Sequence, residues 1–297
     1  MSKIKTNKII IPVDFSKTSL YAVKYAAALA QMAKGEIILL HVHKRADFTD
    51  IIMPALKLRS ITAITKYIKE RLDALANQIK KKYGIKVTSV VSDGSIASEI
   101  VSLAKVSKAG LVIMGTHGKD STSDFFMGSN AYRVLTKSKI PVMTVQKGAE
   151  KASFNKIVLP IDMSAHSREK VGAAINLAKR TGAHLHAVGL LHKDEKNDHY
   201  TLEVVMKQIA KMAADAEVEF SEEIRDSENH ARETLACAKK EKADLIMAMT
   251  DQEAEFSRII LGTYIHQLIN ESKIPVLCIP PGKHTAIVGS DSIGGMW

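Results

Sequence analysis

The sequence predicts an α/β protein built from two tandem copies of one doubly wound unit, and three observations lead to this fold class. The first is an internal repeat, in which residues 7–44 match residues 155–193 and "KSKIPVMTVQKG" at 137–148 matches "ESKIPVLCIPPG" at 271–282. The second is the alternation of short β-branched runs with helical patterns, which is typical of parallel sheets with crossover helices. The third is a length of 297 residues with 46% hydrophobic and 25% charged residues, which suits two globular domains.

The two copies differ in length. Their first matching segments lie 148 residues apart and their last lie 134 apart, so the second copy is about 14 residues shorter. The difference falls after the second strand, opposite residues 45–60, which the sequence leaves open as a lid or a surface loop. We expect a first domain over 1–148, a second over 149–282 with the junction near 147–154, and a C-terminal tail over 283–297.

Five strands and their connecting helices are expected in the first copy. The first helix is expected from Ser16 to Lys34, because serine and threonine cap candidates open it and Gly35 follows its end. Crossovers of this length imply right-handed connections and a five-stranded parallel sheet in each copy, Rossmann-like, with strand order 3-2-1-4-5. The expected strands are Ile9–Val13, Ile37–Val42, Lys86–Val91, Leu111–Met114 and Pro141–Val145.

Composition narrows the class of protein. The net charge of +10 raises the question of nucleic-acid binding, but the lysines are spread along helices beside acidic residues, and aromatic residues make up only 5%. A solvated basic surface therefore explains the charge better than a nucleic-acid site. No apolar run approaches the roughly 20 residues of a membrane span, and the N-terminus lacks a signal-peptide pattern. Cys237 and Cys278 are expected to be buried thiols, and the protein is expected to be cytoplasmic.

The stretch "GTHGKDSTSDFFMGS" at 115–129 follows the fourth expected strand. Gly115 and Gly118 lack Cβ atoms, so backbone N–H groups there can approach an anion closely. Gly128, Ser129 and Asn130 would open the next helix, whose first N–H groups suit phosphate oxygens. The alternative is a helix capped by Ser129 or Asn130, with the glycines only making turns. The spacing fits neither a Walker P-loop nor a dinucleotide fingerprint.

Here the residues carry a family resemblance. The glycine spacing resembles the nucleotide-binding signature of the universal stress proteins, and the first-strand "IPVDFS" and the terminal "KIPVMTV" also resemble that family. The resemblance to the family covers both copies, from about residue 5 to 281. The resemblance implies a tandem universal stress protein, in a family with ATP-binding and non-binding types. It also implies a role in stress response and packing through the fifth strands, 140–145 and 274–279. That packing can form a pseudo-dimer within one chain, and a homodimer of two chains stays open.

The resemblance implies ATP or another adenine nucleotide as the ligand, with any Mg²⁺ carried by the nucleotide. A carboxylate at a strand end, Asp14, can accept hydrogen bonds from the adenine amino group or the ribose, although it can equally cap the first helix. His41 and His43 would point to one face of their strand, but no third ligand is visible, and we predict no metal site. The predicted binding residues are Pro12, Val13, Asp14, Val42, Met114, Gly115, Thr116, His117, Gly118, Gly128, Ser129 and Asn130.

The second copy differs in its loop, which reads "IMAMTDQEAEFSRIILGT". We align Ala248 with Gly115 and Asp251 with Gly118, which puts Gly262 and Thr263 one residue later than their counterparts. Glu253 and Glu255 add negative charge that would repel a triphosphate. We therefore expect that the second copy does not hold ATP in this way. Asp162 keeps the position of Asp14 and is expected to cap a helix.

The sequence favours an ATP-binding regulatory protein that acts through its nucleotide-bound state, with one intact site in the first copy. Two other functions stay open at this point. One is a slow ATP hydrolase or a phosphate or adenylyl transferase, although no positioned general base is evident. The other is an interaction scaffold that ignores nucleotides, and the protein partners are not indicated by the sequence.

Overall fold

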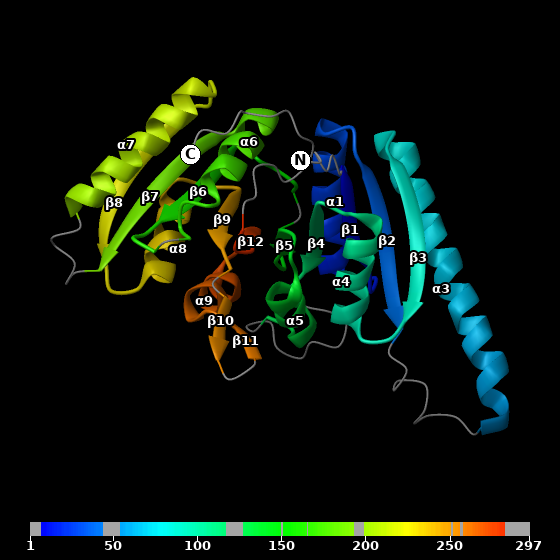
Figure 1. Ribbon diagram of the computed structural model, residues 1–297. Helices are drawn as coiled ribbons and strands as arrows, with labels where there is room; N and C mark the ends of the chain where they lie inside the picture. Colours follow the sequence, from blue (N-terminus) through cyan, green and yellow to red (C-terminus); the bar gives the residue numbers. More distant parts are fainter. Residues whose placement is uncertain are drawn as a thin grey trace.

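A computed structural model describes residues 7–43, 54–116, 127–149, 151–164, 166–192, 199–250, 252–255 and 258–282. It contains a ten-stranded sheet that runs through both copies, with helices on both of its faces (Figure 1). His117, Gly118, Asp251, most of the 45–60 segment and the tail from 283 lie outside the described residues.

The first copy forms five parallel strands in the order β3-β2-β1-β4-β5, which confirms the predicted order. Each predicted strand is present, with bounds that differ by one or two residues. The elements are β1 Lys8–Pro12, α1 Lys17–Met32, β2 Glu36–His43, α3 Pro54–Tyr83, β3 Lys86–Asp93, α4 Ile96–Ser107, β4 Leu111–Gly115, α5 Ser129–Lys137 and β5 Val142–Val145.

The second copy repeats this order as β8-β7-β6-β9-β12. It also contains an antiparallel hairpin of β10 and β11, which the sequence pattern did not predict, in the place of the first copy's glycine loop. The elements are β6 Lys156–Ile161, α6 Val171–Thr181, β7 His184–His192, α7 His199–Asp215, β8 Phe220–Ser227, α8 His230–Lys240, β9 Leu245–Met249, β10 Gln252–Glu255, β11 Arg258–Leu261, α9 Thr263–Glu271 and β12 Val276–Ile279.

The two copies join through an antiparallel pair of their fifth strands. Thr144 pairs with Val276, and Met143 pairs with Leu277. The five-stranded halves are thus continuous, and the packing of fifth strands within one chain that the resemblance implied is present. In Figure 1 these two strands, β5 and β12, lie in the middle of the molecule with one copy on each side.

Two hydrophobic cores lie on opposite faces of the sheet, because neighbouring residues of a strand point to opposite sides. Ile9 and Ile11 of β1 pack with α1, α3, α6 and α7 on one face. Ile10 packs with α4, α5, α8 and α9 on the other. Cys237 and Cys278 are both buried free thiols, as expected. Among the described residues, no helix is both long and apolar enough to span a membrane.

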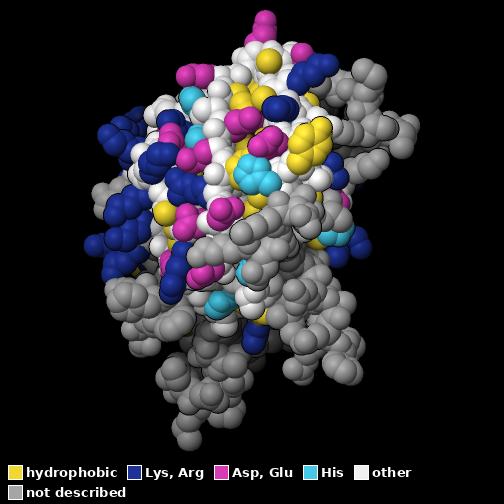
Figure 2. Space-filling view, turned by 90° about the vertical axis from the view of Figure 1, so that its left-hand side faces the viewer, with side chains coloured by type: hydrophobic (Ala, Val, Ile, Leu, Met, Phe, Trp, Pro, Cys, Tyr) yellow, Lys and Arg dark blue, Asp and Glu magenta, His cyan; other side chains and the backbone are white. Residues whose placement is uncertain are grey.

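Charges of both signs lie side by side on the outer edge of the second copy, the face that Figure 2 presents. Lys240 pairs with Glu223 at 2.8 Å between Nζ and Oε2, and Lys156 pairs with Glu241 at 2.9 Å. Basic side chains of this copy thus lie beside acidic partners.

Helix α1 begins and ends close to its predicted limits, but for reasons that differ in detail. Ser16 is the N-cap, and its hydroxyl accepts a hydrogen bond from the N–H of Ser19. At the other end, Lys34 takes the left-handed conformation with a φ of 50°. Gly35 is needed for space, because a Cβ there would lie 2.4 Å from the carbonyl oxygen of Asn7.

We expect Gly35→Ala to destabilise the protein by about 1–3 kcal/mol, because the added methyl group must push the Asn7 backbone away from the end of α1. Gly172→Ala is the matched control. It lies in α6 with open space around the added atom, and it should stabilise the fold by about 0.5–1 kcal/mol through reduced backbone entropy. Urea unfolding of both variants measures the two changes. Equal free energies of unfolding would contradict the close-approach account of Gly35.

Candidate functional site

A cleft lies at the carboxyl ends of β1, β2 and β4, where the winding of the first copy reverses and where doubly wound sheets bind ligands. Its walls come from the strand ends, from the first turns of α1 and α4, and from the start of α5. The lining residues are Pro12, Val13, Asp14, Ser19, Leu40, His41, Val42, Ile96, Met114, Gly115, Thr116, Gly128, Asn130 and Ala131.

Most of the residues predicted from the sequence meet in this cleft. Of the twelve, His117 and Gly118 lie outside the described residues, and Ser129 is the exposed first residue of α5 and does not line the cleft. The other nine line it: Pro12, Val13, Asp14, Val42, Met114, Gly115, Thr116, Gly128 and Asn130. That these residues bind a nucleotide stays a prediction.

The sequence analysis missed five lining residues: Ser19, Leu40, His41, Ile96 and Ala131. Ile96 is the first residue of α4, so its position just after the end of β3 was a signal that could have found it. Leu40 and His41 precede Val42 in the same strand end. Ser19 and Ala131 lie in helix turns, and the sequence does not indicate which side of those turns faces the cleft.

Asp14 is held in a tight turn at the end of β1. Its Oδ1 accepts hydrogen bonds from the backbone N–H of Ser16 at 2.9 Å and from the Ser16 hydroxyl at 2.6 Å. Because Ser16 caps α1, the alternative that Asp14 is the helix cap is wrong. Phe15 between them has a φ of 62°, which is uncommon for a bulky residue. The bonds to Ser16 thus fix the carboxylate at the mouth of the cleft.

His41 forms the neighbouring part of the wall. Its Nδ1 lies 2.6 Å from the carbonyl oxygen of Val13. A carbonyl can only accept, so this nitrogen carries the proton and donates. The His41 and His43 rings lie 5.0 Å apart, on one face of β2 as expected from their spacing. The bond to Val13 leaves Nδ1 of His41 committed to the wall of the cleft.

Gly115 and Gly128 bring three segments together at the floor of the cleft. A Cβ on Gly115 would lie 2.9 Å from both Cβ and Oγ1 of the buried Thr18, so bare backbone here lets α1 approach the end of β4. Gly128 donates its N–H to the carbonyl oxygen of Thr116 at 2.8 Å. The residues on either side of the 117–127 segment are therefore tied to each other.

The start of α5 faces the cleft without a side-chain cap. Gly128 is the N-cap residue and makes no side-chain hydrogen bond, so the alternative of a cap by Ser129 or Asn130 is wrong. The first helical bond runs from the N–H of Tyr132 to Gly128 at 3.1 Å, which leaves the preceding N–H groups outside the helical pattern. Asn130 and Ala131 line the cleft, so the positive end of the helix dipole is directed at it.

Strand register corrects the comparison of the two copies. Gly115 pairs with Val145, and Met249 pairs with Ile279, the equivalent residue of the second copy. Met249 therefore occupies the position of Gly115, and our alignment of Ala248 there is wrong by one residue.

The same register continues beyond the strand. Thr116 and Thr250 make equivalent backbone bonds to the fifth strands, at 3.0 and 2.8 Å. A constant offset then matches Gly262 with Gly128, both N-caps, so the second glycine is not one residue late. It also places Asp251 opposite His117 instead of Gly118.

The corrected register shows how the second copy changes the region of the cleft. The buried side chain of Met249 stands where the first copy has bare backbone. Tyr264 takes the position of Asn130, and the β10–β11 hairpin takes that of the glycine loop. The two copies therefore differ at these positions in side-chain size as well as in the acidic charge of the loop.

Asp162 makes the same turn as Asp14, with Oδ1 accepting from the N–H and hydroxyl of Ser164 at 2.9 and 2.6 Å. Helix α6 begins only at Val171 with Lys170 as the N-cap residue, so the expectation that Asp162 caps a helix is wrong. Burial opposes ionisation of Asp162, but the bonds from Ser164 and the charge of Lys170 outweigh it and hold the pKa below its ordinary value.

The fold and the cleft define a tandem doubly wound α/β protein whose first copy has an open crevice at its switch point. The universal stress protein family matches the chain twice, over residues 5–146 and 153–280. The chain belongs to this family, as a tandem member.

Two universal stress proteins of Methanocaldococcus jannaschii are similar to parts of this chain. MJ0531 is 34% identical over 143 residues, which are 47% of this chain and 82% of that protein. MJ0577 is 31% identical over 153 residues, which are 47% of this chain and 94% of that protein. The crystal structure of a universal stress protein from Archaeoglobus fulgidus covers 94% of this chain and 100% of its own, with 21% identity and a TM-score of 0.76, which is a likeness of fold.

We expect Asp162→Asn to lower the free energy of unfolding at neutral pH by about 1–3 kcal/mol, because the variant loses charge-assisted hydrogen bonds. The pKa of Asp162 is lowered in the folded state, so its ionised form stabilises the fold above the ordinary pKa of about 3.9. This contribution is lost as the pH falls through the lowered value. Urea unfolding in increasingly acidic buffers should therefore bring wild type and variant together. A constant difference would contradict the prediction, and Asp215→Asn, at an exposed position, is the control.

Proposed function

We propose that the cleft of the first copy binds an adenine nucleotide, ATP with Mg²⁺ carried on its phosphates, and that the second copy does not. One observation carries the proposal: a single apolar crevice has a fixed carboxylate at one end and an uncapped helix N-terminus at the other. A nucleotide has the matching sequence of parts, with a flat base, a ribose and an anionic chain.

The base and ribose belong at the β1–β2 side of the cleft. Val13, Leu40 and Met114 are almost completely buried and supply apolar surface for a flat ring. The Asp14 carboxylate stands beside them. Its Oδ1 is held by two bonds from Ser16, and a carboxylate is an acceptor suited to an amino or hydroxyl donor of the ligand.

The phosphates belong at the β4–α5 side. The helix N-terminus attracts anions through its unbonded N–H groups and its dipole. The net charge of +10 favours approach of an anionic ligand in general. We therefore place the phosphate chain of the proposed ligand at the start of α5 and at the 117–126 segment that follows β4.

The function that follows is regulatory. The N–H of Met127, at the end of that segment, donates to Oδ1 of Asn270 in α9 at 2.7 Å. In the other direction, the N–H of Leu261 donates to the Tyr132 hydroxyl of α5 at 3.3 Å. A nucleotide that contacts the segment between Thr116 and Met127 therefore acts on a contact with the second copy, and the protein responds to nucleotide by changing that joint surface.

We expect Asn130→Tyr to weaken ATP binding at least about tenfold, or about 1.4 kcal/mol. This variant introduces the residue type that the second copy has at the equivalent position, Tyr264. The ring would fill the phosphate end of the cleft. Arg133→Tyr is the matched control, because the same side chain then lies at an exposed position further along α5. Isothermal titration should give one site in wild type and control. Two equivalent sites per chain, or unchanged affinity in Asn130→Tyr, would refute the proposal.

We expect Asp14→Asn to weaken ATP binding about 10- to 100-fold, because a bond to a charged acceptor contributes about 1.5–3 kcal/mol. Asp162→Asn changes the same turn in the second copy and should leave the affinity as it is in wild type. Equal effects of the two variants would show that the site is not confined to the first copy. Thermal unfolding of both variants checks that each is folded.

A further inference from the structure

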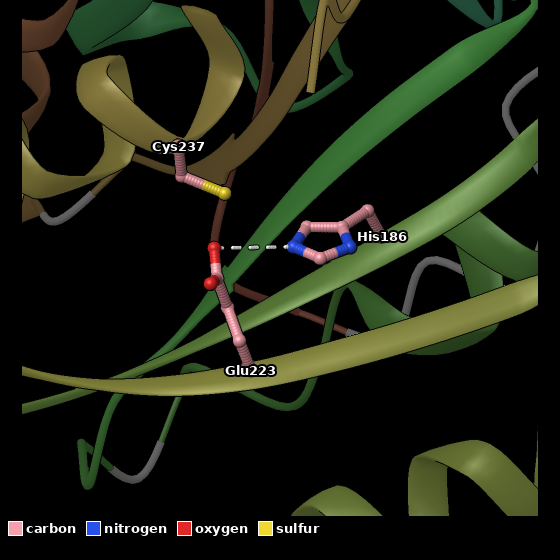
Figure 3. Close-up of side chains that lie close together, drawn as sticks. All are labelled: His186, Glu223 and Cys237. Carbon is pink, nitrogen blue, oxygen red and sulfur yellow. Dashed lines mark ion pairs between the residues drawn. The ribbon is translucent and has the colours of Figure 1, made fainter. Parts of the chain in front are cut away.

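Three side chains with metal-binding atoms converge in the second copy, far along the chain from the nucleotide cleft. His186 comes from β7, Glu223 from β8 and Cys237 from α8, and Figure 3 shows them pointing toward one another. One ligand atom from each lies within 4.8 Å of the other two. His186 is 4% exposed and Cys237 is fully buried. We call these three residues the His–Glu–Cys cluster.

The same three positions are apolar in the first copy. The strand registers match His186 with Ile38 and Glu223 with Val90. Lys108 follows α4 and Lys242 follows α8, and both have a left-handed backbone, so they occupy equivalent positions. Counting back the same number of residues from each matches Cys237 with Leu103. These first-copy residues belong to a hydrophobic core, so the fold itself does not require polar groups here.

A chain of hydrogen bonds fixes the protonation of the His186 ring. Nδ1 of His184 lies 3.1 Å from Glu219, so it carries a proton, and its Nε2 accepts from the hydroxyl of Ser221 at 2.6 Å. The Ser221 oxygen then accepts from Nδ1 of His186 at 2.7 Å. This arrangement leaves Nε2 of His186 with a lone pair.

That lone pair points into the cluster and has no hydrogen-bond partner. The nearest carboxylate oxygen, Oε1 of Glu223, lies 3.5 Å away. Burial lowers the pKa of His186, in agreement with the neutral ring that these hydrogen bonds indicate. Two acceptors that face each other at this distance, one buried and one half-buried, repel, and a cation between them removes the repulsion.

We propose that the His–Glu–Cys cluster binds a divalent transition metal, with Zn²⁺ as the favoured ion. The ligands are Nε2 of His186, Oε1 of Glu223 and Sγ of Cys237. Zinc bonds of about 2.0–2.3 Å to nitrogen, oxygen and sulfur require only small movements of these side chains. A thiolate, a carboxylate and a neutral imidazole give zero net charge with Zn²⁺, which suits a buried site. The bond of Nδ1 to Ser221 supplies the outer contact that orients a ligating histidine.

Metal binding replaces the thiol proton of Cys237 and one hydrogen-bond partner of Glu223. Burial and the neighbouring Glu223 raise the pKa of Cys237 to about 12, so the metal displaces the thiol proton to solvent as the sulfur–metal bond forms. Oε1 of Glu223 now accepts from Arg225 at 2.7 Å, and Oε2 accepts from Lys240 at 2.8 Å. The metal replaces Arg225 at Oε1, while Arg225 keeps Glu233 and Oε2 keeps Lys240.

Co²⁺ titration of the full-length protein, after treatment with a chelator, tests the proposal. We expect one Co²⁺ per chain and a thiolate-to-cobalt absorption band in the near ultraviolet, which added Zn²⁺ removes by displacement. Zn²⁺ should also raise the unfolding temperature, because it binds the folded state. Wild-type protein without a thiolate band, or with a band that Zn²⁺ leaves in place, would overturn the proposal.

The chain offers matched controls. Cys237→Ser should lose the band and weaken binding at least about tenfold, whereas Cys278→Ser, which changes the other buried thiol, should keep both. The triple variant His186→Ile, Glu223→Val and Cys237→Leu introduces the apolar residues that the first copy has at these positions. It should fold without binding Co²⁺. A band that survives in Cys237→Ser, or tight Co²⁺ binding by the triple variant, places the metal elsewhere and overturns the assignment.

Discussion

The antiparallel pairing of β5 with β12 is the contact on which the rest of the molecule depends. It closes one open edge of each five-stranded sheet, so neither copy exposes that edge to other chains. The paired strands are buried throughout, and Oγ1 of Thr144 donates across the seam to the carbonyl oxygen of Val276 at 3.2 Å. The seam also brings α5 and α9 together, with the Tyr132 and His266 rings 6.0 Å apart. The start of α5, which forms one end of the cleft, is therefore supported by the second copy.

The two copies show how one backbone arrangement accepts different side-chain chemistry. Their strand order and their fourth-helix N-caps are the same, because these depend on backbone hydrogen bonds that every residue except proline can make. At the position of Gly115 the second copy carries Met249, and at the position of Ile38 it carries His186. The first change places a buried methionine where the first copy has bare backbone beside Thr18, and the second places a polar ring in a core. Neither alters the sheet.

Much of the fold could be predicted from the sequence, because β-branched runs and the repeat both report burial and topology. Asp14 and Gly115 were found because doubly wound sheets present the ends of their strands at one edge. The predictions that were wrong differ from the structure by only one or two positions along the chain. Asp14 and Ser16 are both good caps two residues apart, and Ala248 and Met249 are both apolar. The His–Glu–Cys cluster has no sequence spacing to reveal it, since strand register and helix packing assemble it from three separate elements.

Duplication explains why two sites of such different character can exist in one continuous sheet. The cleft uses strand ends of β1, β2 and β4 and the dipole of α5, whereas the His–Glu–Cys cluster uses β7, β8 and α8. No element is shared, so the substitutions that introduce the cluster leave the first cleft's walls in place. What the copies do share is the seam, where Asn270 and Tyr132 each bind the backbone of the other copy. These bonds, together with the paired fifth strands, connect the second copy to the segments that border the first cleft.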